Sequence, residues 1–107
     1  MECRVVFADE ELKKSFELLR EKDERLYKEV LSALKTIKDD AFCGRNVKKK
    51  LIPKDLIKKY GINNLWIYNL RRDWRLLYAI TNNEIEVLSI VLDWMNHKDY
   101  EKLFKFA

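Results

Sequence analysis

The stretch from residue 64 to 92 most constrains what this chain can fold into. Three apolar segments, 64–70, 74–81 and 85–92, are separated there by short polar turns. They are rich in β-branched and aromatic residues, and the second turn, Asn-Asn at 82–83, tolerates positive φ and suits a two-residue hairpin. The pattern therefore predicts three consecutive antiparallel strands.

The middle segment, 74–80, is apolar on both faces apart from Arg75 at its start. A strand that is apolar on both faces belongs in the interior of a sheet. Because side chains alternate along a strand, Arg75 shares a face with Leu77 and Ala79, and the residues between them point the other way.

The first forty residues predict one short strand, 3–7, followed by two amphipathic helices. Asp9 and Asp23 are placed to cap these helices, because a carboxylate accepts hydrogen bonds from the free amides of a first turn. Apolar residues then recur at helical spacing. We expect the two helices to form a hairpin that packs on one face of the sheet.

Short helices are also expected after the helical hairpin and at the end of the chain. Pro53 can begin a helix that runs through Tyr60, and Gly61 can end it in the left-handed conformation. Asn96 is placed to cap a short C-terminal helix.

These elements indicate a single α+β domain over residues 1–107. Its expected architecture is an N-terminal strand and a helical hairpin packed on an antiparallel sheet of about four strands, with the short helix last. The sheet face that carries Arg75 is expected to be partly open, and to be bordered by the loop 45–59 and the segment 97–104.

Composition excludes several function classes. No apolar stretch approaches the roughly 20 residues that span a bilayer, so no membrane partner is expected. Two cysteines without metal-ligand spacing fit a reduced, cytoplasmic protein. With one histidine and no ligand cluster we expect no metal, and without a glycine-rich phosphate loop we expect no small-molecule cofactor.

Positive charge is concentrated in one third of the chain. Residues 41–75 contain ten Lys or Arg against two Asp, a net charge of +8, which leaves −4 for the rest of the chain. This segregation favours a polyanionic partner. The alternative is a solvated lysine loop without a partner.

Metal-free RNA cleavage fits the side chains of this region. A guanidinium at Arg75 can grip phosphate oxygens, and the imidazole of His97 can transfer a proton near neutral pH. Lys48 and Lys50 can stabilise developing negative charge, and Tyr100 can stack on a base. Less specific roles stay open: His97 as an exposed helix start, Arg75 paired with a carboxylate, and Tyr100 as a packing residue.

Three stretches carry a resemblance to a known family. They are Asn-Leu-Trp-Ile-Tyr-Asn-Leu at 64–70, Trp-Arg-Leu-Leu-Tyr-Ala-Ile at 74–80, and Asp-Trp-Met-Asn-His-Lys-Asp-Tyr at 93–100. They resemble the RelE/ParE superfamily of toxin–antitoxin systems, and the last looks like the C-terminus of an archaeal branch. The resemblance implies two N-terminal helices packed on a sheet that includes the first strand.

The resemblance also implies an activity and partners. RelE-like members cut mRNA in the ribosomal A site without metal, and each is held by a cognate antitoxin protein. By this resemblance the toxin domain has a catalytic set and an RNA-binding set. The catalytic set is Arg75, His97, Tyr100 and Lys50, and the RNA-binding set is Lys48, Lys49, Lys54, Arg45, Arg71 and Arg72.

The sequence departs from the family pattern at two points. No glutamate occurs in residues 41–75, so the general base of the YoeB-type group has no counterpart, and His97 and Tyr100 are three residues apart rather than adjacent. Two other readings therefore stay open. One is a catalytically inactive RelE-fold protein that binds RNA, the ribosome or a protein, and the other is a ParE-like inhibitor of DNA gyrase.

Overall fold

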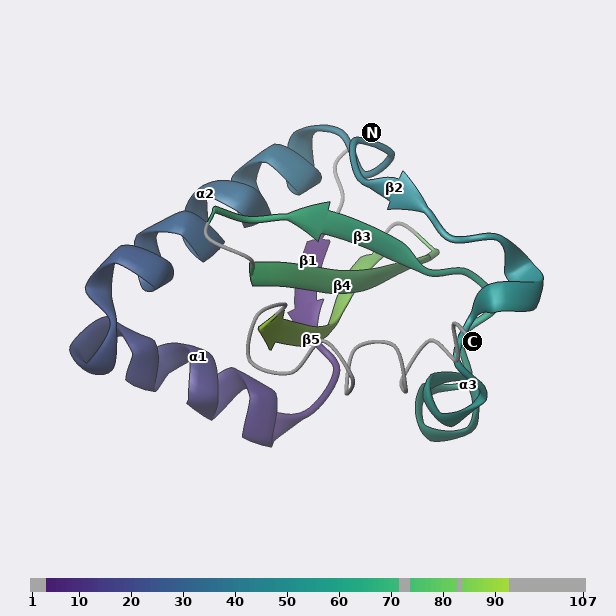
Figure 1. The fold of residues 1–107 in the computed structure, drawn as a ribbon, viewed down its shortest axis with the longest axis horizontal. Coiled ribbons are helices and arrows are strands. Elements are labelled where there is room, and N and C mark those ends of the chain that lie inside the picture. The colour runs from purple at the N-terminus through teal and green to yellow at the C-terminus, as the bar shows by residue number, and fades with distance from the viewer. Residues whose placement is uncertain (1–3, 72–73, 83, 93–107) are drawn as a thin grey trace.

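In the computed structural model, residues 4–71, 74–82 and 84–92 are described, the last four by backbone alone. The elements in chain order are β1 (Arg4–Phe7), α1 (Glu10–Lys22), α2 (Glu24–Asp39), β2 (Arg45–Asn46), the 3-10 helix η1 (Lys49–Leu51), α3 (Lys54–Tyr60), β3 (Trp66–Asn69), β4 (Trp74–Thr81) and β5 (Glu84–Leu92). Figure 1 shows α1 and α2 on one side of the sheet and α3 on the other. None of the described helices combines the length and apolar character needed to cross a membrane.

The five strands form one mixed sheet in the order β1-β5-β4-β3-β2. β1 pairs with β5 in parallel, and the other three pairings are antiparallel. The α+β class and the three-strand meander are confirmed, whereas the expected sheet of about four antiparallel strands is corrected to five with one parallel pair. The additional strand, β2, is two exposed residues long, and so short a segment carries no hydrophobic period that could reveal it.

The middle strand β4 is buried on both faces, as predicted. Leu76, Leu77, Tyr78 and Ala79 are each 0% exposed. Leu76 and Tyr78 pack in a core under α1 and α2, while Leu77 and Ala79 pack in a second core on the opposite face. The alternation read from the sequence is therefore confirmed.

The second core limits how far this face can be open. Around Leu77 and Ala79 this face is closed by Ile52, Leu56 and Ile62, which are all buried. These residues come from the segment between β2 and β3, which supplies a buried side chain at intervals while its lysines stay outside. An open surface can exist on this face only outside the patch that α3 and its flanking residues cover.

Helix boundaries follow the predicted caps. The Asp9 carboxylate accepts a hydrogen bond from the Leu12 amide at 2.7 Å, and the Asp23 carboxylate accepts one from the Leu26 amide at 3.1 Å. Such caps each stabilise a helix by about 1 kcal/mol. Gly61 ends α3 with φ of 65°, as expected, and Asn82 has φ of 37° in the β4–β5 turn. The predicted cap at Asn96 lies outside the described residues.

A buried tyrosine connects the end of α2 to the middle of the sheet. The Tyr78 hydroxyl donates a hydrogen bond to the Ala41 carbonyl at 2.7 Å and accepts one from the Gly44 amide at 3.1 Å. A Cβ atom at Gly44 would lie 2.6 Å from this hydroxyl, so the approach requires glycine. Burial raises the pKa of Tyr78 well above its ordinary value, which keeps the donor protonated.

We expect Tyr78→Phe to lower the free energy of unfolding by about 1–3 kcal/mol, because the buried Ala41 carbonyl and Gly44 amide would lose their partner. Urea denaturation measures this difference. Tyr68→Phe is the matched control, since the Tyr68 hydroxyl makes no hydrogen bond within the described part of the chain. Equal stability of the two variants would contradict the role assigned to Tyr78.

Candidate nucleic-acid interface

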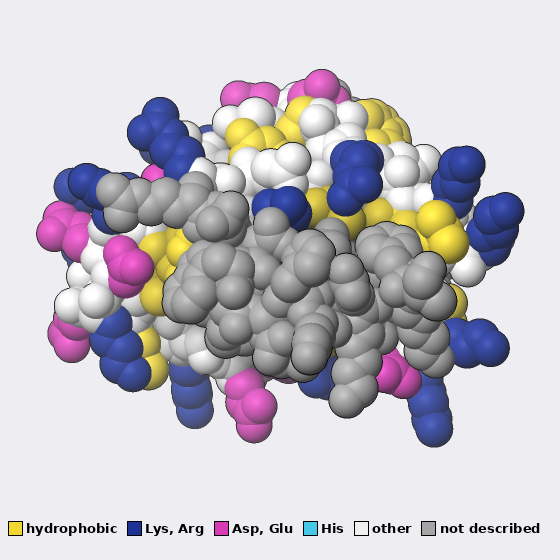
Figure 2. Space-filling view, in the orientation of Figure 1, with side chains coloured by type: hydrophobic (Ala, Val, Ile, Leu, Met, Phe, Trp, Pro, Cys, Tyr) yellow, Lys and Arg dark blue, Asp and Glu magenta, His cyan; other side chains and the backbone are white. Residues whose placement is uncertain are grey.

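The segment from β2 through α3 presents a cationic surface. We call residues 45–59 the basic segment, and every Lys or Arg side chain in it is exposed: Arg45, Lys48, Lys49, Lys50, Lys54, Lys58 and Lys59. Figure 2 shows dark-blue side chains projecting along the edge of the molecule where η1 and α3 lie in Figure 1. Four of the predicted RNA-binding residues and the predicted catalytic Lys50 are therefore exposed within one continuous segment.

Apolar residues hold the basic segment against the sheet. Ile52 and Leu56 are buried in the core under α3, and the Val47 amide donates a hydrogen bond to the Leu65 carbonyl at 2.9 Å. Because these anchors face the sheet, the lysines between them face solvent. The segment is therefore a fixed surface rather than an unanchored loop.

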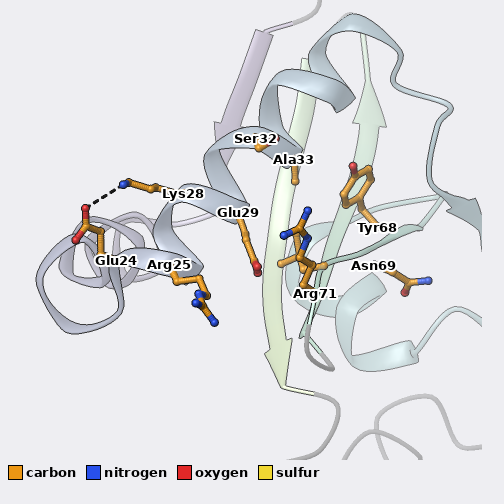
Figure 3. Close-up of a pocket in the computed structure, with 10 residues that line it drawn as sticks. Glu24, Arg25, Lys28, Glu29, Ser32, Ala33, Tyr68, Asn69 and Arg71 are labelled. Carbon is orange, nitrogen blue, oxygen red and sulfur yellow. Dashed lines mark ion pairs between the residues drawn. The ribbon is translucent and has the colours of Figure 1, made fainter.

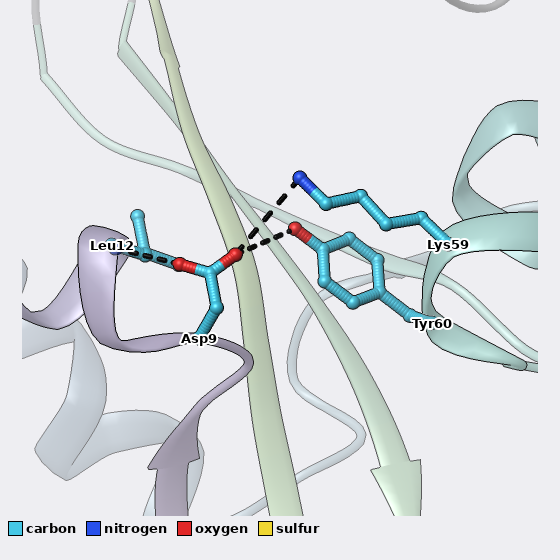
Figure 4. A network of polar contacts seen from close by, with 4 residues as sticks. All are labelled: Asp9, Leu12, Lys59 and Tyr60. Atoms are coloured by element: carbon cyan, nitrogen blue, oxygen red, sulfur yellow. Dashed lines mark hydrogen bonds and ion pairs between the residues drawn. The ribbon is translucent and has the colours of Figure 1, made fainter.

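A polar network ties the end of α3 to the start of α1. The Asp9 carboxylate accepts a hydrogen bond from the Tyr60 hydroxyl at 3.2 Å and lies 4.0 Å from the Lys59 ammonium group (Figure 4). The Lys59 ammonium group also lies 5.1 Å from the centre of the Tyr60 ring. One carboxylate thus caps α1 and positions α3.

Two arginines share the sheet face that the basic segment borders. Arg45 lies opposite Ile67 in the β2–β3 pairing, and Ile67 lies opposite Leu77 in the β3–β4 pairing, so the three side chains share a face. Arg75 is two residues from Leu77 on β4 and therefore points to the same face. From strand spacing and rise, the Cα atoms of Arg45 and Arg75 are roughly 12 Å apart. Arg75 is half-buried and its Nε atom is shielded from solvent, whereas Arg45 is exposed.

Among the described residues, the charge of the basic segment is largely uncompensated. Among the ion pairs formed between described residues, only Lys59 with Asp9 involves this segment. Arg45, Lys48, Lys49, Lys50 and Lys54 have no carboxylate partner within the described part of the chain. Clustered cations without counter-charges attract a polyanion and release its counterions on binding.

Not every predicted residue joins this surface. Arg71 is exposed beside α2, where it lines a groove formed with that helix (Figure 3). The aromatic side chains of Trp66 and Tyr68 pack against the core on the α1–α2 side, so they point away from the face of Arg75. Arg72, His97 and Tyr100 lie outside the described residues.

No pattern in the sequence indicated the groove in Figure 3. Its volume is about 900 Å³, and its walls come from residues 24–33 of α2 and from the end of β3 with the residues after it. The α2 residues that line it, such as Arg25 and Glu29, occupy the polar side of an amphipathic helix. A polar helix side of this kind has the same sequence pattern whether it forms the wall of a groove or faces only water, so the pattern cannot distinguish the two.

The described residues do not favour metal binding or thiol chemistry. No group of three His, Cys, Asp or Glu side chains there is close enough to hold a metal ion. Burial, and then the negative charge of Asp40, raise the pKa of the exposed Cys43 thiol, which disfavours the nucleophilic thiolate. Cationic recognition remains the main chemical capacity of this surface.

Comparisons with protein-family models, with curated proteins and with solved structures find no match for this chain.

We expect the basic segment to bind single-stranded RNA in a salt-dependent manner. Replacing Lys48, Lys49 and Lys50 together by Gln should lower the slope of log affinity against log salt concentration by about 2, since each phosphate contact contributes roughly 0.7. A fluorescent 2′-O-methyl RNA, which lacks the attacking hydroxyl, allows binding to be measured without cleavage.

The matched control replaces the exposed Lys13, Lys14 and Lys35 of the helical hairpin by Gln, which removes the same charge from another surface. If both triple variants reduce the slope equally, binding follows net charge and the basic segment is not the interface.

Proposed function

We propose that this protein is a RelE-like toxin of a type II toxin–antitoxin system, a metal-independent endoribonuclease that cleaves mRNA on the ribosome. The observation that carries this proposal is the placement of Arg45 and Arg75 on one sheet face, bordered by exposed lysines that mostly have no carboxylate partner among the described residues. The α+β architecture, with a helical hairpin on the opposite face, is compatible with the resemblance in the sequence.

The proposed reaction is an intramolecular displacement at phosphorus. The 2′-hydroxyl loses its proton to a base and attacks the adjacent phosphate, the bond to the 5′-oxygen breaks, and the leaving oxygen gains a proton. The products are a 2′,3′-cyclic phosphate and a 5′-hydroxyl. No oxidant, cofactor or metal is needed for this balance.

Arg75 is assigned to the developing negative charge in this scheme. Its guanidinium forms two-point contacts with phosphate oxygens, and its partial burial strengthens those contacts relative to water. Lys50 adds positive charge, His97 supplies the proton for the leaving oxygen, and Tyr100 stacks on an exposed base.

The remaining cations are assigned to binding and to inhibition. Arg45, Lys48, Lys49 and Lys54 hold the RNA backbone, and Arg72 adds a further cation. A cognate antitoxin in the cytoplasm would block the toxin by covering the cationic surface with an acidic segment. Charge complementarity is the physical basis for that partner.

One observation favours a second function, that of a catalytically inactive RNA- or ribosome-binding relative. Residues 41–75 contain no glutamate, so this region offers no glutamate as the general base for the 2′-hydroxyl. The same cationic surface would then bind RNA without cutting it.

We expect Arg75→Ala to reduce mRNA cleavage in a translating extract by about 100-fold or more, and Arg75→Lys to reduce it less, because lysine keeps the charge but loses the two-point contact. Growth arrest on expression should weaken in parallel. Lys13→Ala on α1 is the control for a lost surface cation. Urea denaturation of each variant separates lost activity from lost folding.

Three outcomes would overturn the nuclease proposal. Toxicity that persists in the double variant Arg75→Ala with His97→Ala would exclude the assigned chemistry. Growth arrest with intact mRNA would favour the binding function. Inhibition of gyrase supercoiling by the purified protein, again with intact mRNA, would identify a ParE-like target.

A further inference from the structure

The outer edge of β3 is paired over only half of its length. β2 pairs with Trp66 and Ile67, and within the described part of the chain no strand continues this pairing beside Tyr68 and Asn69. The chain before β2 turns away instead, because the Gly44 amide bonds to the buried hydroxyl of Tyr78. An unpaired edge of this kind is a template for another strand.

The backbone of Asn69 points toward this empty edge. The Leu70 amide donates a hydrogen bond to the Trp74 carbonyl at 2.9 Å. Leu70, and every second residue before it in β3, therefore forms its backbone hydrogen bonds with β4. The Leu65 carbonyl accepts a hydrogen bond from the Val47 amide of the chain that follows β2. The backbone groups of Leu65, Ile67 and Asn69 therefore point toward the β2 side. Because hydrogen-bonding directions alternate, the Asn69 N–H and C=O groups point away from β4.

The groove of about 900 Å³ adjoins this edge. Figure 3 shows α2 on one side of it and Tyr68, Asn69 and Arg71 on the other. Ser32 and Ala33 of α2 have short side chains, which leaves room next to β3. An added strand needs only about 4.8 Å of separation from its neighbour.

The charges in the groove indicate what it would accept. Lys28 is paired with Glu24 at 3.1 Å, which leaves Arg25 and Arg71 against the single carboxylate of Glu29. Tyr68 and Leu70 add partly buried apolar surface to the β3 wall. The lining therefore complements a segment that carries an acidic and an apolar side chain.

We propose that an extended segment of a partner protein adds to the sheet at Asn69, alongside β3, and places an acidic side chain between Arg25 and Arg71. Backbone hydrogen bonds to Asn69 would supply affinity, and the alternate side chains of the segment would supply specificity. The site uses groups other than the basic segment, so the proposal does not require RNA cleavage.

The test selects binders from a displayed library of random peptides of about seven residues, slightly longer than a typical strand, on the full-length protein. Enriched peptides should contain an acidic residue and should shift the backbone amide signals of Asn69 and Arg71 in NMR spectra. Asn69→Pro should weaken the best peptide at least tenfold, because it removes the outward N–H and leaves the β4 ladder intact. Asn69→Ala is the matched control and should bind as the unchanged protein does.

The charge contact is tested by exchange. Arg71→Glu should weaken the acidic peptide, and a peptide with lysine in place of its acidic residue should regain affinity for that variant. If Asn69→Pro does not fold, the peptide can be changed instead. N-methylation of each peptide amide in turn removes one possible hydrogen bond to the Asn69 carbonyl, and methylation at one of these amides should abolish binding.

Several results would overturn the proposal. They are a library without enrichment, peptide-induced shifts elsewhere in the protein, or equal binding by Asn69→Pro. A concentration-dependent dimer that is lost in Asn69→Pro would make a second copy of this chain the occupant. Displacement of the peptide by single-stranded RNA, with shifts at the same two amides, would assign the groove to the RNA site.

Discussion

Burial of β4 on both faces is the constraint on which the rest of this structure depends. Leu76 and Tyr78 need an apolar cover on one side, and Leu77 and Ala79 need one on the other. The helical hairpin supplies the first cover, and Ile52, Leu56 and Ile62 supply the second. Loss of either cover would expose half of a central strand, so both parts of the chain are fixed by the same element.

The second cover also determines the chemistry of the surface. Residues that anchor the segment between β2 and β3 alternate with lysines, so packing of the apolar residues brings the cations to one edge of the sheet. The tie between Asp9 and Tyr60 fixes the end of α3 to the start of α1. Stability and charge display therefore have a common origin, which makes the basic segment a pre-organised surface.

Much of the fold could be predicted from particular residues, whereas the site could be predicted only in part. The caps at Asp9 and Asp23, the left-handed end at Gly61 and the central place of β4 all follow from local chemistry or from alternation. The sequence did not reveal the parallel pairing of β1 with β5, because a strand separated from its partner by most of the chain has no turn that sets its direction. The sequence analysis also grouped Arg71 with the lysines of the basic segment, whereas the structure places the Arg71 side chain in the groove beside α2.

The sequence alone determined most of the helices and strands, which residues of β4 share a face, and where positive charge is concentrated. These properties depend on spacing and composition over a few residues. The tertiary structure decided that the face of Arg75 is closed at its centre and that Trp66 and Tyr68 turn away from it. It also decided that no described strand pairs with half of the outer edge of β3. Those properties depend on contacts between segments far apart in the chain, and local patterns carry no information about such contacts.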